Sequence, residues 1–187
     1  MVRLVALSAL LLAMLACSVA QATSALALTT REQAELSAAV VLATVGPSTQ
    51  EVHPQYLRPV TVTELRVDRV LLDAAPATVP VRQWRGELNG RFSTIPGDAD
   101  LHRGEQVVAF LRQVDGQWFL TALSQSVFRV SHGSDPSLER HVDVALFTRA
   151  PDGRLLPLAA PLSPPTTLSA MESALRGLTP RGPETTQ

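Results

Sequence analysis

The chain has 187 residues, 16 basic and 17 acidic, and a formal net charge of −1 at pH 7. A nearly neutral chain without a basic run lacks the electrostatic footprint of a nucleic-acid-binding protein. Every basic residue apart from histidine is arginine, which removes lysine-dependent Schiff-base and general-base chemistry.

Residues 1–22 are predicted to be a secretory signal peptide. Arg3 provides a basic start, residues 4–16 are apolar except for Ser8, and Ala20-Gln21-Ala22 offers the small side chains that a signal peptidase accepts. The apolar run is shorter than the roughly 20 residues of a membrane-spanning helix. We therefore expect cleavage after Ala22 and a secreted or periplasmic mature chain without a transmembrane span.

The single cysteine, Cys17, offers an alternative. Ala16-Cys17-Ser18 resembles a lipoprotein processing site, although Met14 and Leu15 stand where such sites carry leucine and a small residue. Lipidation of Cys17 would make the protein a membrane-anchored envelope lipoprotein with a structural or assembly role. Cleavage after Ala22 instead leaves no cysteine, which excludes disulfides and thiolate chemistry from the mature chain.

Residues 23–156 are predicted to form a mainly β domain. A short helix begins at Thr30, with Gln33 in the capping-box position, and ends near Ser37. Residues 38–45 are apolar and β-branched, as in a buried strand, and Gly46-Pro47 closes them. The polar, proline-containing residues 46–58 are then expected to be a loop.

The second strand begins at Val60 and is predicted to bend. Its apolar residues switch from even to odd positions near Glu64, which one inserted bulge residue produces. Residues 79–84 form a third strand, and Pro80 favours an edge position. Residues 85–104 are rich in glycine and proline, and we expect an irregular loop there.

The clearest unit is a β-hairpin over residues 107–114 and 117–123. Asp115-Gly116 suits a two-residue type I′ turn, in which both residues have positive φ. That turn pairs Leu111 with Leu120 and Arg112 with Phe119. Because large apolar side chains occupy both faces, the hairpin is expected to be central and covered on both sides.

The rest of the chain is predicted to add two strands and a helix. The strands cover residues 127–130 and 142–147, and a turn at 151–153 follows them. After a proline-rich connector at 157–166, residues 167–179 form a helix that plugs one end of the barrel, and the tail 180–187 is disordered. The helix places its apolar residues on one face, and these are Leu168, Met171, Leu175 and Leu178.

Four groups of side chains are candidate sites, and each also has an ordinary structural interpretation. His132 and His141 flank a loop and are a candidate metal-binding pair, with solvated loop histidines as the alternative. Asp98, Asp100 and Glu105 stand in or beside the loop 85–104 and are candidate calcium ligands, because calcium binds carboxylate oxygens, with a solvated loop as the alternative. Neither group has a metal-binding spacing. Glu87 with Glu105 is a candidate carboxylate pair of the kind that glycosidases use. The last group is a set of aromatic residues that either stacks on a ligand or fills the core, and it comprises Trp84, Phe92, Trp118 and Phe119.

Residues 79–130 resemble an uncharacterised group of exported bacterial proteins. The resemblance rests on Trp84-Arg85-Gly86-Glu87, Ile95-Pro96-Gly97-Asp98-Ala99, the segment 104–111 and the segment 123–130. Arg85 and Ser126 replace glycines of the group's pattern. The resemblance implies export and an OB-like barrel of the netrin and metalloproteinase-inhibitor type, with about six to seven strands. It implies no activity and transfers no catalytic residue.

The function that these observations favour is an exported, non-enzymatic binding or interaction domain. Its partner is expected to be an extracellular or envelope protein, such as a protease, or a glycan. A hydrolase that uses loop carboxylates or histidines is the least favoured alternative, and no cofactor, metal or catalytic residue is predicted. The loop 85–104 is the expected contact surface of such a domain, because long ordered loops are usually functional. The alternative is a solvated connector in which Phe92 and Ile95 are buried against the barrel. Its predicted binding residues are Glu87, Arg91, Phe92, Asp98, Asp100, His102 and Arg103.

Overall fold

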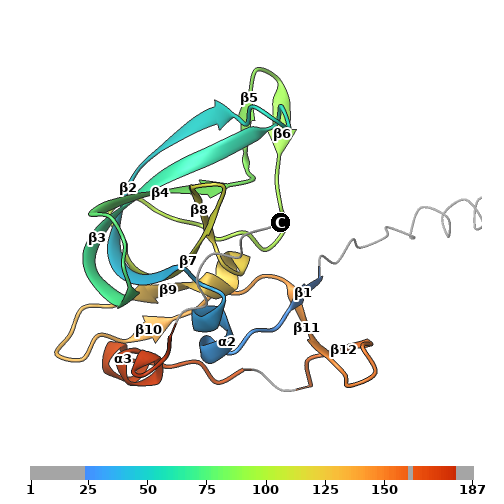
Figure 1. Cartoon of the computed structure of the whole chain (residues 1–187). Coiled ribbons are helices and arrows are strands. Elements are labelled where there is room, and N and C mark those ends of the chain that lie inside the picture. The colour runs from blue at the N-terminus through green and yellow to red at the C-terminus, as the bar shows by residue number, and fades with distance from the viewer. Residues whose placement is uncertain (1–23, 160–161, 180–187) are drawn as a thin grey trace, which may run out of the picture.

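The computed structural model describes residues 24–159 and 162–179. The predicted signal peptide, Cys17 and the tail 180–187 lie outside these residues. The described chain is mainly β, with two short α-helices, as the sequence predicts (Figure 1). In the part of the chain that the structure describes, no helix is both long and apolar enough to cross a bilayer.

Five strands close into a barrel. β2 (Ala39–Val52) pairs antiparallel with β3 (Pro59–Asp73) and with β7 (Gln106–Val114). β3 pairs antiparallel with β4 (Thr78–Gln83), and β8 (Gln117–Leu120) joins β7 to β4. The β4–β8 pair is parallel and completes the ring. This small closed sheet is the architecture of an OB-like barrel, and it confirms the predicted fold class.

The β7–β8 turn has the predicted form. Asp115 and Gly116 have φ values of 50° and 73°, which are the two positive angles of a type I′ turn. Leu111 pairs with Leu120, and Arg112 pairs with Phe119. The turn therefore sets the register of the hairpin as expected.

β2 is longer than predicted, because Gly46-Pro47 does not end it. The strand passes through these residues with a register shift between Val45 and Ser48 and continues to Val52. A Cβ on Gly46 would lie 3.0 Å from the Glu64 carbonyl oxygen, so glycine lets the two strands approach. The irregularity thus lies opposite Glu64, as predicted, but the inserted residue belongs to β2 and not to β3. The predicted loop 46–58 shrinks to residues 53–58.

β7 separates two apolar cores, which confirms that the hairpin is covered on both sides. Val107, Ala109 and Leu111 point into the barrel and pack against inward residues of β2, β3, β4 and β8. Val108 and Phe110 point outward into a second core beneath the helices. All five side chains are fully buried.

Two helices cover this second core. α2 (Thr30–Glu35) begins where predicted, but its N-cap is Thr29 rather than Thr30, and Glu32 rather than Gln33 completes the capping box. α3 (Leu168–Leu175) buries Leu168, Met171 and Leu175, as its periodicity predicts. None of these three belongs to the barrel interior. The helix therefore lies against the outer face of the barrel, and the expected plug at a barrel end is wrong.

Beyond β7, the sheet continues through β9 (Val127–Val130) and β10 (Leu138–Glu139). The short helix η1 (Leu123–Ser126) links β8 to β9 and contributes buried Ser124, Gln125 and Ser126. These segments run beside the barrel rather than within its ring (Figure 1).

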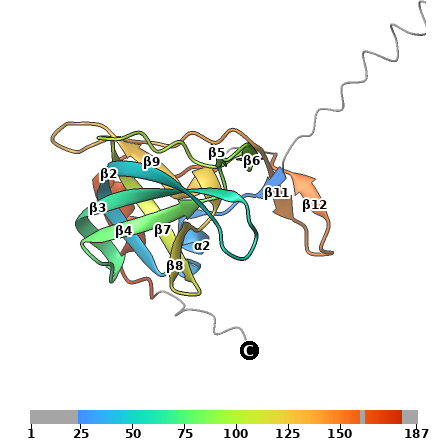
Figure 2. The ribbon, with the colours of Figure 1, turned by 90° about the horizontal axis from the view of Figure 1, so that it is seen from above.

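A second, three-stranded sheet stands to one side of the barrel (Figure 2). β1 (Ser24–Leu26) pairs parallel with β11 (Ala145–Arg149), and β11 pairs antiparallel with β12 (Leu155–Pro157). The predicted strand 142–147 thus starts later and belongs to this sheet, not to the barrel. Gln125 holds β1 in place, since its side-chain amide donates to the Leu26 carbonyl at 2.9 Å.

Candidate functional site

The predicted loop 85–104 contains a β-hairpin and is not irregular throughout. β5 (Gly86–Leu88) and β6 (Arg91–Ser93) pair antiparallel around Asn89-Gly90. Asn89 and Gly90 have φ values of 53° and 69°, so this is a second type I′ turn. Asn-Gly is the strongest short-range hairpin signal in a sequence, so the signal for this hairpin was present.

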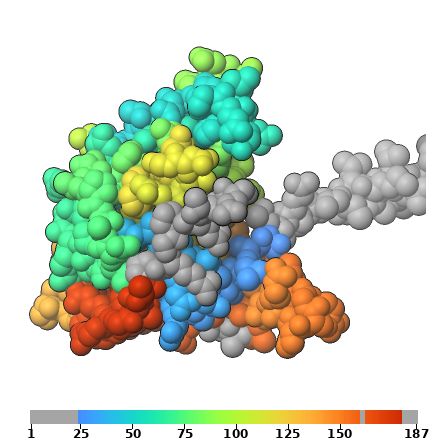
Figure 3. Space-filling view, in the orientation of Figure 1, coloured from blue at the N-terminus to red at the C-terminus, as the bar shows by residue number. Residues whose placement is uncertain are grey.

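The β5–β6 hairpin and the β2–β3 loop, residues 53–58, form one protrusion, which we call the protruding loops (Figure 3). Arg91 Nη1 donates to the Leu57 carbonyl at 2.7 Å and ties the two segments together. Three large apolar side chains are more than half exposed here: Tyr56 at 56%, Leu57 at 56% and Phe92 at 71%. The protruding loops therefore present apolar surface to solvent.

A hollow of about 340 Å³, the aromatic cleft, lies between the β2–β3 loop and the β7–β8 turn. The rings of His53, Tyr56 and Trp84 meet along its wall, with centroid distances of 4.8–5.4 Å. Phe119 adds a fourth ring, and Arg112 and Gln117 supply polar groups. Such a mixture of aromatic and planar polar side chains is typical of a binding site.

The aromatic residues singled out in the sequence are divided between site and core. Trp84 and Phe119 line the aromatic cleft, and Phe92 stands on the hairpin. Trp118 is only 9% exposed and belongs to the barrel interior. His53 and Tyr56 were not among the predicted site residues, because the sequence of their segment predicts only a polar loop. Only the fold reveals them, because it brings this segment beside Trp84, Arg91 and Phe119.

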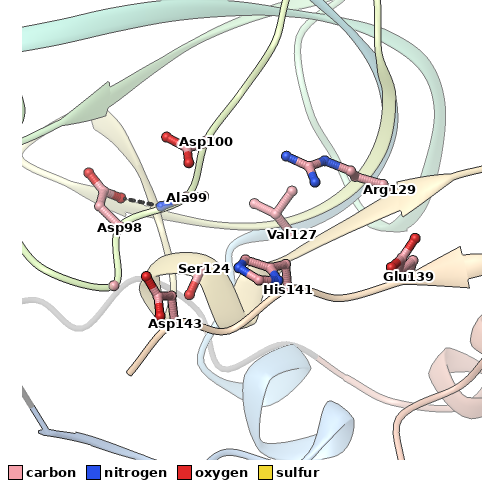
Figure 4. A pocket seen from close by; sticks show the side chains of 10 residues that line it. Asp98, Ala99, Asp100, Ser124, Val127, Arg129, Glu139, His141 and Asp143 are labelled. Carbon is pink, nitrogen blue, oxygen red and sulfur yellow. Dashed lines mark hydrogen bonds between the residues drawn. The ribbon is translucent and has the colours of Figure 1, made fainter. Parts of the chain in front are cut away.

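A second candidate site, the acidic pocket, has a volume of about 100 Å³ (Figure 4). Asp98 and Asp143 stand on one side, with Arg129 and Glu139 opposite. Asp100, Ser124 and His141 also line it. The chain between β6 and β7 supplies the two aspartates at 98 and 100, so part of the predicted loop does reach a pocket.

Two neighbouring aspartates of this pocket have opposite environments. Asp98 Oδ1 accepts hydrogen bonds from Gln83 Nε2 and from the Ala99 amide, both at 2.9 Å, yet burial raises the pKa of this carboxyl above its usual 3.8. Asp100 accepts a hydrogen bond from Arg85 Nη1 at 2.7 Å, and this contact lowers the pKa of Asp100. Burial therefore disfavours the charged form of Asp98, whereas the hydrogen bond from Arg85 favours the charged form of Asp100.

The seven predicted binding residues fall in three places. Glu87, Arg91 and Phe92 lie on the β5–β6 hairpin, and Asp98 and Asp100 line the acidic pocket. His102 is exposed, and Arg103 borders a separate groove beside β9. The predicted contact surface is thus not one continuous site.

The structure also places the remaining candidate groups. Among the described residues, no set of three or more His, Cys, Asp and Glu side chains is arranged to hold a metal ion. His132 and His141 border different hollows. Glu105 lies 3.4 Å from Arg129 Nε, whereas Glu87 is on the hairpin.

Ser124, His141 and Asp143 share the acidic pocket but do not form a hydrogen-bonded triad. The Ser124 hydroxyl has no hydrogen-bond partner among the described residues. Nucleophilic catalysis by serine needs such a bond to its base. The arrangement offers polar groups to a ligand rather than an assembled nucleophile.

No protein-family model, curated protein or solved structure matches this chain. The resemblance to exported bacterial proteins therefore stays a prediction.

Proposed function

We propose that this protein is an exported binding domain that contacts a protein partner through its protruding loops and aromatic cleft. Export is inferred from the predicted signal peptide. The β-barrel positions the loops, and the ligand is bound without chemical change. The residues that we expect to carry the binding energy are Tyr56, Trp84, Phe92 and Phe119.

One observation carries this proposal: Tyr56, Leu57 and Phe92 are more than half exposed on adjoining segments beside a cleft lined by aromatic rings. Clustered exposed apolar side chains on a soluble domain mark an interaction surface. Aromatic and arginine side chains are the residues that most often dominate protein interfaces. Arg91 and Arg112 flank the cluster and complete this composition.

A protein partner fits these residues better than a glycan does. Sugar rings stack on aromatic faces and bind planar polar groups, which the cleft provides, but the exposed aliphatic side chain of Leu57 gives a sugar little to bind. A protein partner can bury Leu57 together with Phe92. Binding of a glycan confined to the cleft is the second outcome that the experiment distinguishes.

Site-specific photo-crosslinking tests the proposal. A photoreactive phenylalanine analogue replaces Phe92 in the exported protein, and cross-linking is carried out on cells that produce it. The matched control carries the analogue at Leu155, which is 50% exposed but lies on the separate small sheet. We expect one discrete protein adduct from position 92 and none from position 155.

A purified partner then allows measurement of affinity. We expect Phe92→Ala to weaken binding at least tenfold with an unchanged melting temperature, as for an interface anchor. No specific adduct at position 92, or a lower melting temperature with intact binding, contradicts the proposal. A glycan that binds and is lost on Trp84→Ala, but not on Phe92→Ala, replaces the protein partner by the glycan.

A further inference from the structure

We propose that the acidic pocket binds the guanidinium group of an arginine side chain supplied by the protein partner. That the arginine belongs to the protein partner rests on the proposed function. That the pocket prefers a guanidinium group does not. The inference starts from polar groups that the fold holds in the pocket without satisfying them.

The floor of the pocket contains an unsatisfied hydroxyl. Ser124 is 7% exposed, and its Oγ makes no hydrogen bond within the described residues. Buried hydroxyls without a partner are rare in native proteins, because each forfeits its hydration. Because Ser124 is part of the pocket lining, a donor bound in the pocket lies beside this hydroxyl.

Asp98 adds a carboxylate oxygen, Oδ2, that can still accept a hydrogen bond. Its Oδ1 accepts from Gln83 and Ala99, but the described residues donate no hydrogen bond to Oδ2. Burial raises the pKa of Asp98, and no arginine forms an ion pair with it in the described part of the chain. A bound cation would offset that burial.

The rim is built from alternate residues of one extended segment. Glu139, His141 and Asp143 border the pocket, whereas the intervening Arg140 turns away and lies 5.3 Å from the centre of the Phe128 ring. This alternation is the period of two of an extended chain. It brings two further carboxylates, Glu139 and Asp143, to the pocket. Neither forms an ion pair with an arginine among the described residues.

Two arginines lie near the pocket, and Arg129 is part of its lining. Arg85 Nη1 donates to Asp100 and to the Ala99 carbonyl, and Arg129 pairs with Glu105. Three carboxylates, Asp98, Glu139 and Asp143, therefore remain without an ion pair among the described residues. The lining has four carboxylates, Asp98, Asp100, Glu139 and Asp143, against one arginine, so negative charge is in excess around about 100 Å³ of space.

The arrangement selects a planar cation. The acidic side chains do not converge as a metal ion requires. A compact ammonium group likewise favours ligands gathered around one point, whereas a guanidinium spreads five N–H donors over a plane. Carboxylates on opposite sides of a pocket, with a hydroxyl on the floor, match that spread (Figure 4).

The test is a titration of the full mature protein with N-acetyl-arginine methylamide. Binding is monitored through the NMR chemical shift of the Ser124 backbone amide. The neutral citrulline analogue and the lysine analogue are measured in parallel. We expect saturable binding of the arginine compound, weaker binding of the lysine compound and none of the citrulline compound. Addition of salt should weaken the binding, as for any charge pair near the surface.

Three variants locate the site. Asp143→Asn and Ser124→Ala should each weaken binding roughly tenfold, the loss expected for one hydrogen bond to a charged group. Asp152→Asn removes the same charge at a turn of the small sheet and should change nothing. Ser124→Ala removes a hydroxyl with no protein partner, so the fold should be retained.

Absence of a saturable shift, equal binding of citrulline, or full affinity in both pocket variants overturns the inference. These results leave the proposed function intact, because that proposal depends on cross-linking at position 92. Arginine binding without an adduct at position 92 has the opposite meaning: it retains the pocket and refutes the protein interface.

Discussion

Gly97 allows the two walls of the acidic pocket to approach each other. Its φ is +81°, and a Cβ at this position would lie 2.2 Å from Val144 Cγ1. We expect Gly97→Ala to destabilise the protein by about 1–3 kcal/mol from backbone strain, and further from the displaced valine. Denaturant unfolding measures this loss.

Gly153→Ala is the matched control. Gly153 also has a positive φ, +86°, but no atom lies within 4 Å of the position that a Cβ would take. The difference between the two variants therefore isolates the contact with Val144. Equal losses would show that Val144 moves aside freely and does not close the pocket.

Asp98 predicts an unusual dependence of stability on pH. Because burial raises its pKa in the folded state, the folded protein binds the proton more tightly than the unfolded chain, and Asp98 lowers stability as pH rises through the interval above 3.8. Asparagine can still accept the bonds from Gln83 and Ala99. We expect Asp98→Asn to be more stable than the wild type at neutral pH, with the gain lost below pH 3.8.

Asp100→Asn should have the opposite effect. Its pKa is lowered by Arg85, so its contribution to stability is present above the usual value of 3.8 and is lost as pH falls through the lower folded pKa. Thermal unfolding of both variants from pH 3 to pH 7 compares them. Parallel pH curves for the two variants would contradict the assigned environments.

At the scale of the elements, α3 tests how the second core is closed. Leu175 is 2% exposed in the cluster that also contains Met171 and Phe110. We expect Leu175→Ala to cost about 2–4 kcal/mol, the usual loss for a buried leucine. Urea midpoints measure it, and Leu156→Ala, at a side chain that is 42% exposed, is the control.

Deletion of all residues after Pro165 extends this test. If the helix closes the second core, the truncated protein is far less stable than the full chain. Unchanged stability would contradict this role of the helix, because its removal exposes Val40 and Phe110 on the outer face of β2 and β7 to water.

Local signals in the sequence predicted the hairpin, the apolar face of α3 and the strong core strands. The Asp115-Gly116 turn is the clearest case, because two adjacent residues determine its geometry. The path of β2 beyond Gly46-Pro47 could not be predicted in this way. A Gly-Pro pair is compatible both with a bulge inside a strand and with the end of a strand. Only the pairing with β3 at Glu64 shows that it is a bulge here.

The candidate sites were less predictable because tertiary structure assembles them. Asp98, Ser124 and Asp143 are distant in the sequence and meet only after β8, η1 and the segment before β11 are in place. The aromatic cleft likewise joins His53 to Phe119 across the barrel end. Phe92 was predicted as a contact residue, because its own segment carries it to the surface.

At the scale of the whole molecule, the processed N-terminus is the first property to establish. We expect the exported protein to begin at Thr23, one residue before β1, because Ala20 and Ala22 fit the peptidase subsites. Intact mass and N-terminal sequencing measure this directly. A lipid-modified Cys17 at the terminus would instead support the envelope lipoprotein.

The barrel ring has one short junction, where β4 and β8 share only the pairs Val81–Trp118 and Arg82–Phe119. Local opening occurs most readily where the fewest interactions must break, so transient breathing of the barrel should begin here and admit water towards Trp118. Phe119 and Trp84 border this junction and also the aromatic cleft. A partner held between them bridges the junction, and it would slow amide exchange along both β4 and β8.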